Sequence, residues 1–419
     1  MRILVQKFGG TSVASLERMQ LARQKVLAGL QRAEKALVVV SARSGETNKL
    51  LDLARKWSPE PDPAEQDLLL STGEQISAAL FAMLLKDAGI RARSCTGRQI
   101  GIRTDNVFGK ARIRAIDKDF ILKTLEDFEV LVVAGFQGVT ADGRITTLGR
   151  GGSDTSAVAL AAAVQAQLCE IFTDVEGVFT TDPNICPQAR KLDRVSYDEM
   201  LEMASMGAKV LEIRSVEFAK KFTVPVLVRS TFSDAPGTFV TQEEPCMEHV
   251  LVSGIAYDRD QARITLRAVP DRPGVAAAIF TPLAQANLSV DMIVQNPSHD
   301  GVTDMNFTIS RKDLSNALRI MKDIQDSLGV TEILFDDNVA KVSAIGVGMR
   351  NHSGVAAAAF SALRRENINI LMISTSEIKI SCIIEEKYTE LAVRTLHDAF
   401  GLSGPPGAGE DMETVRPSR

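Results

Sequence analysis

Residues 149–175, GRGGSDTSAVALAAAVQAQLCEIFTDV, place a glycine-rich loop, an Ala-rich helical pattern and an apolar strand pattern in direct succession. The glycines let the backbone come close to an anion, and the first turn of a helix has N–H groups without an intrahelical partner. Ser153 and Asp154 are residue types that cap helices, and a cap is the simpler interpretation of this loop. Three glycines and Arg150 exceed what a cap needs, so we expect an anion site here.

Apolar strand patterns and helical patterns alternate over residues 1–232. The strand patterns are ILVQKF (3–8), ALVVVSA (36–42), EVLVVAGFQG (129–138), CEIFTDV (169–175) and VPVLVRS (224–230), and the clearest helical patterns are residues 16–30 and 155–168. Strands that are apolar on both faces and separated by helices predict an α/β fold with a largely parallel sheet sandwiched by helices. Ligands of such sheets bind at the carboxyl ends of the strands.

Polar loops follow several of these strands. KFGGTS (7–12) repeats the glycine-rich pattern and adds the charge of Lys7, although it lacks the spacing of a Walker A loop and an ordinary strand-to-helix turn remains the alternative. STGE (71–74) is expected to cap a helix, and TDVEGVFTTDP (173–183) is either a ligand loop or a surface hairpin. Two glycine-rich loops in one domain favour a phosphate or carboxylate ligand.

The C-terminal part of the chain contains an internal repeat. Residues 271–296, DRPGVAAAIFTPLAQANLSVDMIVQN, align without a gap with residues 351–376, NHSGVAAAAFSALRRENINILMISTS. Each copy continues into another strand and a second helix, which predicts two ferredoxin-like βαββαβ modules.

Composition limits the chemistry. The chain has 419 residues, 48 basic against 53 acidic, which argues against a nucleic-acid binder. All four histidines lie beyond residue 248, so a histidine triad or a His-ligated zinc site is excluded from the N-terminal part. Five scattered cysteines without a C-x-x-C pair indicate reduced thiols. With no apolar run of membrane-spanning length, we expect a cytoplasmic protein without membrane contact.

The motifs KFGGTS, VVSARSGET (39–47), LLSTGEQIS (69–77), AGFQG (134–138), TTLGRGGSDTSA (146–157) and TDVEGVFTTDP, followed by the repeat, resemble the monofunctional aspartate kinases (aspartokinases). The resemblance implies an amino-acid-kinase fold with two C-terminal ACT domains. It implies a catalytic domain over 1–245, a linker and first ACT strand over 246–263, ACT domains over 264–340 and 341–402, and a flexible tail over 403–419.

The resemblance also implies the activity, which is ATP-dependent phosphorylation of L-aspartate to 4-phospho-L-aspartate, the first step of Lys, Thr and Met biosynthesis. The aspartate side chain is already ionised at pH 7, so no general base is required. The cofactors are ATP and Mg²⁺, with the metal held mainly through ATP and no side-chain ligand assigned. Catalysis would rest on Lys7, Asp154 and Lys209.

The implied binding residues form two sets. Those for ATP are Lys7, Phe8, Gly9, Gly10, Thr173, Asp174, Phe179, Thr180, Asp182 and Lys209. Those for aspartate are Ser41, Thr47, Glu74, Phe136, Arg150, Gly151, Gly152 and Ser153, with Arg150 on the α-carboxylate and Glu74 on the ammonium group. The chain departs from the family pattern at Arg43 and at Asn184, and the second departure puts one nucleotide contact in doubt.

The ACT modules imply feedback inhibition by Lys or Thr or both. The expected effector residues are Asp271, Gly274, Val275, Ala276 and Gln295 in the first copy and His352, Gly354, Val355, Asn369, Ile370, Ser376 and Glu377 in the second. Packing within paired modules is the alternative role for these residues. We expect a homo-oligomer formed through the ACT domains, and a short second subunit starting near Met247 is an alternative to an ordinary linker methionine.

Two other functions compete. Another amino acid kinase, acting on glutamate, acetylglutamate or a nucleotide, would share the N-terminal motifs but not the paired repeats. A catalytically silent amino-acid-sensing subunit would share the repeats, although the intact KFGG and GRGGSD motifs argue against it. A fused homoserine dehydrogenase is excluded because the repeats occupy residues 250–419.

Overall fold

A computed structural model describes residues 1–206, 210–243, 251–295, 301–351 and 354–404. The chain forms two compact units, which we call the N-terminal and C-terminal units. The N-terminal unit contains Met1–Phe179 and Lys191–Ser205 and continues to the end of the last strand before residue 244. The C-terminal unit contains the chain beyond residue 250 and also the segment Thr180–Arg190, which is enclosed in sequence by the N-terminal unit.

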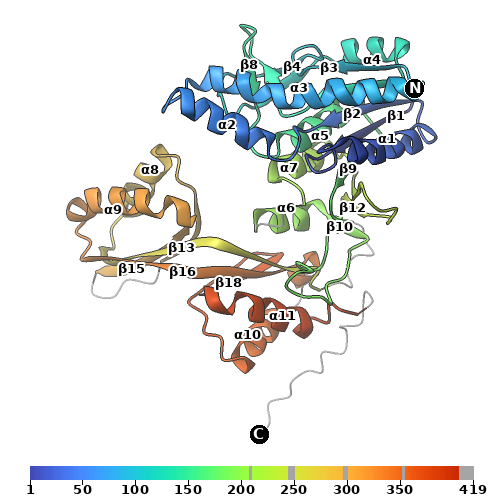
Figure 1. Ribbon diagram of the computed structural model, residues 1–419. Helices are drawn as coiled ribbons and strands as arrows, with labels where there is room; N and C mark the ends of the chain where they lie inside the picture. Colours follow the sequence, from blue (N-terminus) through green and yellow to red (C-terminus); the bar gives the residue numbers. More distant parts are fainter. Residues whose placement is uncertain (207–209, 244–250, 296–300, 352–353, 405–419) are drawn as a thin grey trace. The chain divides into compact units, whose positions relative to one another are not determined.

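The N-terminal unit is an α/β sandwich around one eight-stranded sheet (Figure 1). Its strands, in spatial order, are β10 (Arg194–Ser196), β12 (Thr238–Thr241), β11 (Val226–Ser230), β9 (Cys169–Thr173), β1 (Ile3–Phe8), β2 (Lys35–Val40), β6 (Val130–Ala134) and β3 (Ala92–Cys95). Only β11 and β12 pair antiparallel. A smaller sheet has the order β5 (Ile113–Ile116), β4 (Ile102–Thr104), β7 (Gln137–Val139) and β8 (Ile145–Thr147). The predicted, largely parallel sheet is thereby confirmed.

Helices cover both faces of the large sheet. They are α1 (Leu16–Leu30), α2 (Glu46–Trp57), α3 (Pro63–Asp87), α4 (Lys118–Asp127), α5 (Gly152–Val164), α6 (Tyr197–Ser205) and α7 (Ile213–Phe222). Helices α1 and α3 pack on one face in a core that contains Phe8, Val38 and Phe81. Helix α5 contacts β1 and β2 from the other face, so the strand ends are enclosed between layers.

Helix α3 is the one described helix that is long and apolar enough, by length and composition, to cross a membrane. Half of its most apolar window is buried within the structure, and its contacts with β3 and β6 account for its apolar side chains. The core helix of a globular domain has the same character, so the finding is weak evidence for a membrane span.

Three local predictions in this unit were wrong. Residues 129–138 form two strands, β6 and β7, because Phe136 adopts a left-handed conformation (φ 67°) and turns the chain between them. STGE (71–74) lies inside α3 rather than at its start, which is Pro63 with Asp62 as N-cap. Helix α5 begins at Gly152 with Gly151 as N-cap, so Ser153 and Asp154 stand in its first turn and do not cap it.

The C-terminal unit is built on a single six-stranded antiparallel sheet. Its strands, in spatial order, are β14 (Val290–Gln295), β15 (Val302–Ile309), β13 (Gly254–Pro270), β16 (Glu332–Ile345), β18 (Lys379–Glu385) and β17 (Met372–Thr375). Two long strands, β13 and β16, pair over most of their length and serve both modules. The repeat therefore does not give two separate βαββαβ sheets, because the second module takes one of its strands from the beginning of β13.

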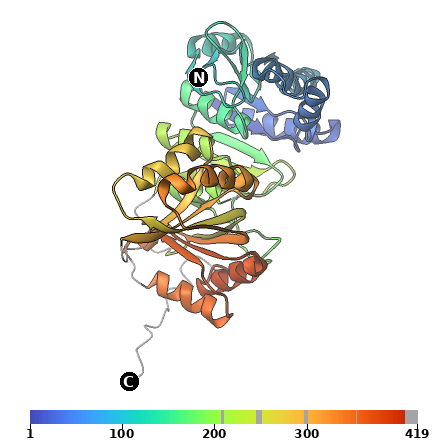
Figure 2. The same cartoon turned by 90° about the vertical axis from the view of Figure 1, so that its left-hand side faces the viewer.

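The helices α8 (Val275–Gln285), α9 (Leu314–Leu328), α10 (Val355–Arg365) and α11 (Thr389–Ala399) complete the modules. Figures 1 and 2 show α8 and α9 on one face of the sheet and α10 and α11 on the other. Each pair covers its own core, and Ile333 and Val342 of β16 belong to different cores. The duplication recurs in the backbone, since Asn287 and Asn367 both adopt a left-handed conformation (φ 57° and 56°) after α8 and α10.

Candidate active site

A pocket of about 300 Å³ lies in the N-terminal unit where the carboxyl ends of β1, β2 and β6 approach the start of α5. It is the position at which ligands bind to parallel α/β sheets. Its lining residues are Lys7, Gly10, Ser41, Ala42, Arg43, Ser44, Gly45, Thr47, Glu74, Phe136, Gly149, Arg150, Gly151, Gly152, Ser153 and Asp154. The structure therefore brings together all the residues predicted to bind aspartate and adds Lys7 and Asp154.

Lys7 and Asp154 form a buried ion pair in this pocket. Lys7 is the penultimate residue of β1, Asp154 stands in the first turn of α5, and the Nζ–Oδ1 distance is 2.5 Å. Both residues are less than a tenth exposed. An acidic side chain in the first turn of a helix is favoured by the helix dipole. Asp154 therefore fixes the Lys7 ammonium group at the end of β1, where Lys7 still lines the pocket.

Glu74 is a buried carboxylate with one unused oxygen. It is 3% exposed, and its Oε1 accepts a hydrogen bond of 3.0 Å from Ala42 N, whereas Oε2 is buried without a partner. Burial raises the pKa of Glu74 to about 7, and the bond from Ala42 opposes this shift. Gly73 permits the approach, because a Cβ there would lie 2.9 Å from the Ala42 side chain. An unsatisfied buried carboxylate oxygen marks a position for a ligand cation.

Close backbone contacts give the pocket its shape. A Cβ on Gly10 would lie 2.8 Å from Ala42 O, and one on Gly152 would lie 2.8 Å from the Phe136 ring. Phe136 itself keeps its left-handed conformation while its N–H donates to Ser156 Oγ at 3.1 Å. Such strain, about 1–3 kcal/mol, persists where the surroundings enforce it, which is common at binding sites.

Arg150 is the exposed cation of the pocket rim. It lies between Gly149 and Gly151, both of which have positive φ (82° and 62°). A Cβ on Gly151 would overlap the side chain of Glu212, which precedes α7. Burial raises the pKa of Glu212, and the charge of Arg150 opposes the shift. The rim therefore presents a cation that is only partly offset by a neighbouring acid.

The residues predicted to hold the nucleotide are more dispersed. Phe8 is buried in the core that α1 and α3 cover, while Gly9 lies next to Lys7, since a Cβ on Gly9 would make an ordinary contact of 3.5 Å with Nζ. Thr173 ends β9 and Asp174 follows it, on the surface. Phe179 is the last N-terminal-unit residue before Thr180 and Asp182, which belong to the C-terminal unit. Lys209 lies outside the described residues.

Asp67 is a buried residue of the site that the sequence patterns did not single out. It is 1% exposed in α3 and accepts hydrogen bonds from Gly109 N, Thr147 N and Thr147 Oγ1 at 2.7–2.8 Å. Burial raises its pKa and these bonds oppose the shift. Thr147 is the last residue of β8, and Gly149 and Arg150 of the rim follow shortly after it. Through its bonds to Thr147, Asp67 therefore helps to position the rim. A single acidic residue in a helical pattern gives no signal for such a role.

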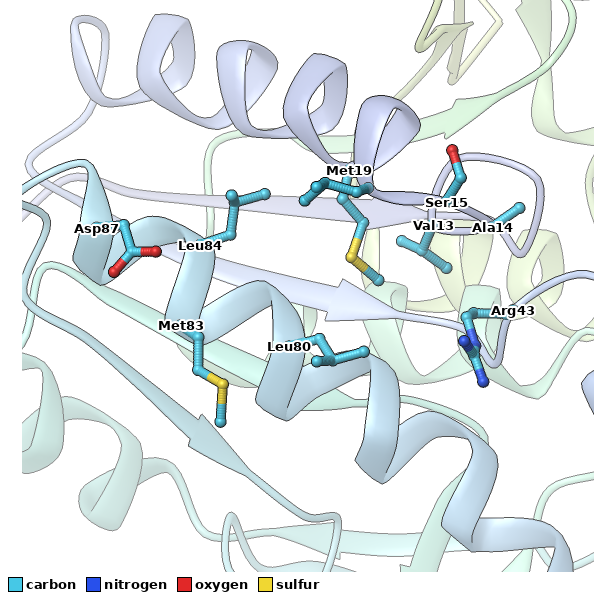
Figure 3. A pocket seen from close by; sticks show the side chains of 10 residues that line it. Val13, Ala14, Ser15, Met19, Arg43, Leu80, Met83, Leu84 and Asp87 are labelled. Carbon is cyan, nitrogen blue, oxygen red and sulfur yellow. The ribbon is translucent and has the colours of Figure 1, made fainter.

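A second pocket of about 270 Å³ lies between α1 and α3 (Figure 3). Val13, Met19, Leu80 and Leu84 make it mainly apolar, with Asp87 and Arg43 at its ends (Figure 3). Arg43 also lines the first pocket and forms an ion pair with Glu46 at 3.6 Å. Arg43, one of the two residues at which the chain departs from the family pattern, therefore lies between the two pockets.

The predicted effector residues are mostly exposed and lie near the starts of α8 and α10, at the end of β14 and on either side of β17. Asp271, Gly274, Ala276, Gln295, Gly354, Asn369, Ser376 and Glu377 are exposed and Ile370 is half-buried. Val275 and Val355 are buried in the two module cores, so only their backbone groups can face a ligand. His352, like Met247, lies outside the described residues.

Among the described residues, no group of three or more His, Cys, Asp or Glu side chains is placed to hold a metal ion.

Comparison with known families identifies three matching regions. Residues 2–230 match the amino acid kinase family, and residues 264–328 and 342–400 each match an ACT domain family.

Curated relatives match over nearly the whole chain. An aspartate kinase of Stutzerimonas stutzeri is 54% identical over 408 residues, covering 97% of this chain and 99% of the relative. An aspartokinase of Pseudomonas aeruginosa is 54% identical over 412 residues, covering 98% and 100%. An aspartokinase of Helicobacter pylori is 50% identical over 404 residues, covering 96% and 99%.

Solved structures agree with the fold. E. coli aspartokinase III in complex with aspartate and ADP has a TM-score of 0.79 and 29% identity, covering 95% of this chain and 99% of that one. The same enzyme in complex with lysine and aspartate has a TM-score of 0.74, with the same identity and coverage.

Proposed function

The chain belongs to the aspartate kinases of the amino acid kinase family, and from this premise we propose that the pocket at the start of α5 binds L-aspartate beside the phosphates of ATP. It is an enzyme that uses ATP to phosphorylate the side-chain carboxylate of aspartate. We further propose which residues bind each substrate, how the metal ion is held and how the enzyme is regulated.

The assignment of aspartate as the substrate of this pocket rests mainly on Oε2 of Glu74, which is buried and has no hydrogen-bond partner. Aspartate has two carboxylates and one ammonium group, so its site needs two cationic regions and one anionic partner. Glu74 supplies the anion, and Arg150 and Lys7 supply cations, within one pocket of about 300 Å³. Glu74 would bind the ammonium group, Arg150 the α-carboxylate, and Lys7 would lie next to the reacting carboxylate and the transferred phosphoryl group.

The chemistry is mainly electrostatic. The attacking carboxylate is ionised at pH 7 and must approach a polyanion. Two like unit charges at ~4 Å repel by about 1 kcal/mol in water and about 4 kcal/mol at an effective dielectric constant near 20. Lys7 and the positive end of the α5 helix dipole would offset this repulsion as charge moves in the transition state. Asp154 would hold Lys7 in position through their 2.5 Å ion pair.

The loop around Gly9 and Gly10 fits a phosphate group. Gly9 places no side chain beside the Lys7 ammonium, and Gly10 lets this loop contact the loop after β2, where Ser44 N donates to Gly10 O at 3.1 Å. Mg²⁺ would arrive bound to ATP, whose phosphate charge it neutralises. We place Thr173 and Asp174 beside the nucleoside part and Lys209 beside the β- and γ-phosphates.

Regulation and assembly belong to the C-terminal unit. An effector amino acid, Lys or Thr, would place its carboxylate at the start of α8 or α10, beside Val275 or Val355, whose side chains are buried in the module cores. The sheet ends in two edge strands, and the equivalent residues Ile293 and Ile373 on them are 52% and 43% exposed. Exposed apolar edge strands favour pairing with a second chain, so we propose a homo-oligomer formed through the ACT modules.

The test is acyl-phosphate formation, trapped with hydroxylamine, in the presence of MgATP. Aspartate, glutamate and acetylglutamate are compared, each with and without added Lys and Thr. Turnover on aspartate alone supports the substrate assignment, and suppression by either amino acid supports the regulatory one. Turnover on glutamate or acetylglutamate instead would refute the assignment of Glu74 and Arg150 to aspartate.

A further inference from the structure

Residues 180–190, which we call the strap, leave the N-terminal unit and return to it. Phe179 and Lys191, on either side of the strap, pair as an isolated antiparallel bridge and belong to the N-terminal unit. Within the strap, Thr180 N donates to Arg190 O at 2.8 Å, and Arg190 N donates to Thr180 Oγ1 at 2.9 Å. The strap is thus a closed loop. The residues on either side of it belong to the N-terminal unit, and the strap itself belongs to the C-terminal unit.

Hydrogen bonds from two elements, α11 and β13, hold the strap in the C-terminal unit. Thr180 Oγ1 is 2.9 Å from Nε2 of His397 in α11, and Ile255 N of β13 donates to Thr180 O at 2.7 Å. The Tyr257 hydroxyl donates to Asp182 Oδ2 at 3.1 Å. These bonds are made at the start of the strap, on the buried Thr180 and the half-buried Asp182.

The side chain of Ile185 anchors the strap in the core of the second ACT module. It is 9% exposed and belongs to the same cluster as Val355 and Leu396. Val355 begins α10, and Leu396 precedes His397 in α11. Any rearrangement at the start of α10, where an effector is expected, therefore reaches the residues on which the strap packs.

His397 is suited to hold the strap as a neutral ring. It is fully buried, its Nε2 faces the Thr180 hydroxyl, and its Nδ1 faces Cys186 Sγ at 3.6 Å and Ser403 Oγ at 3.4 Å. Burial lowers the pKa of His397, with Asp398 opposing and Arg190 assisting the shift. A neutral ring accepts from the Thr180 hydroxyl at Nε2 and carries its proton on Nδ1.

The strap also continues directly from the stretch expected to hold the nucleotide. TDVEGVFTTDP (173–183) begins at the end of β9 and ends inside the strap. Only residues 174–179 separate β9 from the anchored Thr180. Fixing both ends of so short a segment restricts its conformation and thereby the position of Asp174.

We propose that the docking of the strap on the second ACT module sets the affinity of the enzyme for ATP, with Thr180, His397 and Tyr257 as positioning residues. This inference rests on the proposed function, because it uses the proposed role of Thr173 and Asp174 at the nucleoside part of ATP. It adds a physical route by which the second module acts on the active site.

The test uses the full-length protein and three variants that remove or keep one hydroxyl group. Thr180→Val removes the bond to His397 and also the bond from Arg190 N within the strap, Tyr257→Phe removes the bond to Asp182, and Thr180→Ser keeps the hydroxyl. The control is Tyr388→Phe, since Tyr388 packs against the same core and no described bond joins it to the strap. Calorimetry measures the dissociation constant of MgATP, steady-state kinetics measures KM and kcat, and hydrogen exchange follows Ile185 and Cys186, whose N–H groups donate to Asp182 O.

We expect Thr180→Val and Tyr257→Phe to weaken MgATP binding at least fivefold and to accelerate exchange at Ile185 and Cys186. In Tyr257→Phe the KM for aspartate and kcat should stay within twofold, Tyr388→Phe should behave as wild type, and Thr180→Ser should restore the MgATP affinity that Thr180→Val loses. Unchanged MgATP affinity in both hydroxyl-deletion variants overturns the inference, whatever the turnover. Failure of the proposed function is seen separately, as a wild-type protein that binds MgATP but does not phosphorylate aspartate.

Discussion

Lys7, at the end of β1, and Asp154, in the first turn of α5, form an ion pair of 2.5 Å in which both residues are less than a tenth exposed. The pair joins the two glycine-rich loops of the chain, which are separated by more than a hundred residues of sequence. It brings one cation to the point where a phosphate group and a carboxylate would meet.

If Lys7 has the proposed role, replacing it by Ala should reduce kcat at least 100-fold, because the positive charge that would lie next to the reacting groups is lost. Loss of a preorganised electrostatic group costs about 3–4 kcal/mol in comparable sites. Asp154 is left buried without its partner, so unfolding stability should also fall, by about 3–5 kcal/mol. Steady-state kinetics and denaturant unfolding measure the two effects.

The double variant Lys7→Met with Asp154→Asn separates these effects. It removes both charges and should recover much of the lost stability while remaining inactive. If the double variant, or Lys7→Ala alone, kept more than half of the wild-type kcat, the catalytic role of Lys7 would be wrong.

Binding of aspartate should depend on the ionisation of Glu74. Its pKa is about 7 in the free protein, and only the ionised carboxylate can pair with the ammonium group of the substrate. The KM for aspartate should therefore increase about tenfold for each pH unit below 7 and level off above 7. Initial rates between pH 5.5 and 8.5 test this, with the KM for ATP as the internal reference.

Glu74→Gln is the matched variant for that profile. It keeps an oxygen for the bond from Ala42 N but has no charge, so the KM for aspartate should be high and should not change between pH 6 and 8. A Glu74→Gln enzyme with a wild-type KM at pH 8 would refute the ammonium role.

Glu74 should also make the free protein less stable as the pH rises. Its folded-state pKa of about 7 exceeds the ordinary value of 4.5, so the protonated form is favoured by folding. Stability is then unaffected below pH 4.5, decreases between pH 4.5 and 7, and is lower by a constant amount above pH 7, on the order of 3 kcal/mol. Glu74→Gln should remove this decrease, so at pH 8 this variant should unfold at higher denaturant concentration than wild type, despite its weaker binding of aspartate. Urea unfolding at pH 5 and pH 8 measures the difference.

The fold could be predicted largely because its signals are local. Residues 3–8 and 16–30 form β1 and α1 as expected, and the parallel sheet follows from strands that are apolar on both faces. The shared strands β13 and β16 could not be predicted in the same way. Nothing in a local pattern shows that one long strand pairs with elements of two modules, because this depends on contacts distant in sequence.

In the candidate site, too, residues that belong to local motifs could be predicted, and residues whose roles depend on contacts distant in sequence could not. The pocket residues on the glycine-rich loops were identified through motifs, and the structure brings them together. Asp67 was missed because its role is to bond with Gly109 and Thr147, far away in the chain. The docking of Thr180 on His397 was missed for the same reason, and TDVEGVFTTDP was considered only as a ligand loop or hairpin.

The two adjacent glycines after β1 should respond differently to an added methyl group. A Cβ on Gly10 would lie 2.8 Å from Ala42 O, a backbone atom of the loop that also donates to Glu74, so Gly10→Ala must displace one loop. A Cβ on Gly9 would make only ordinary contacts, 3.5 Å from Lys7 Nζ and 3.7 Å from Phe172 O.

Gly10→Ala should therefore lose unfolding stability, by about 1–3 kcal/mol, and should raise the KM for aspartate. Gly9→Ala should unfold like wild type but bind MgATP at least tenfold more weakly, because its methyl group occupies the space beside the Lys7 ammonium. Thermal unfolding and MgATP calorimetry on the pair distinguish the two roles. Wild-type ATP affinity in Gly9→Ala would place the phosphates elsewhere.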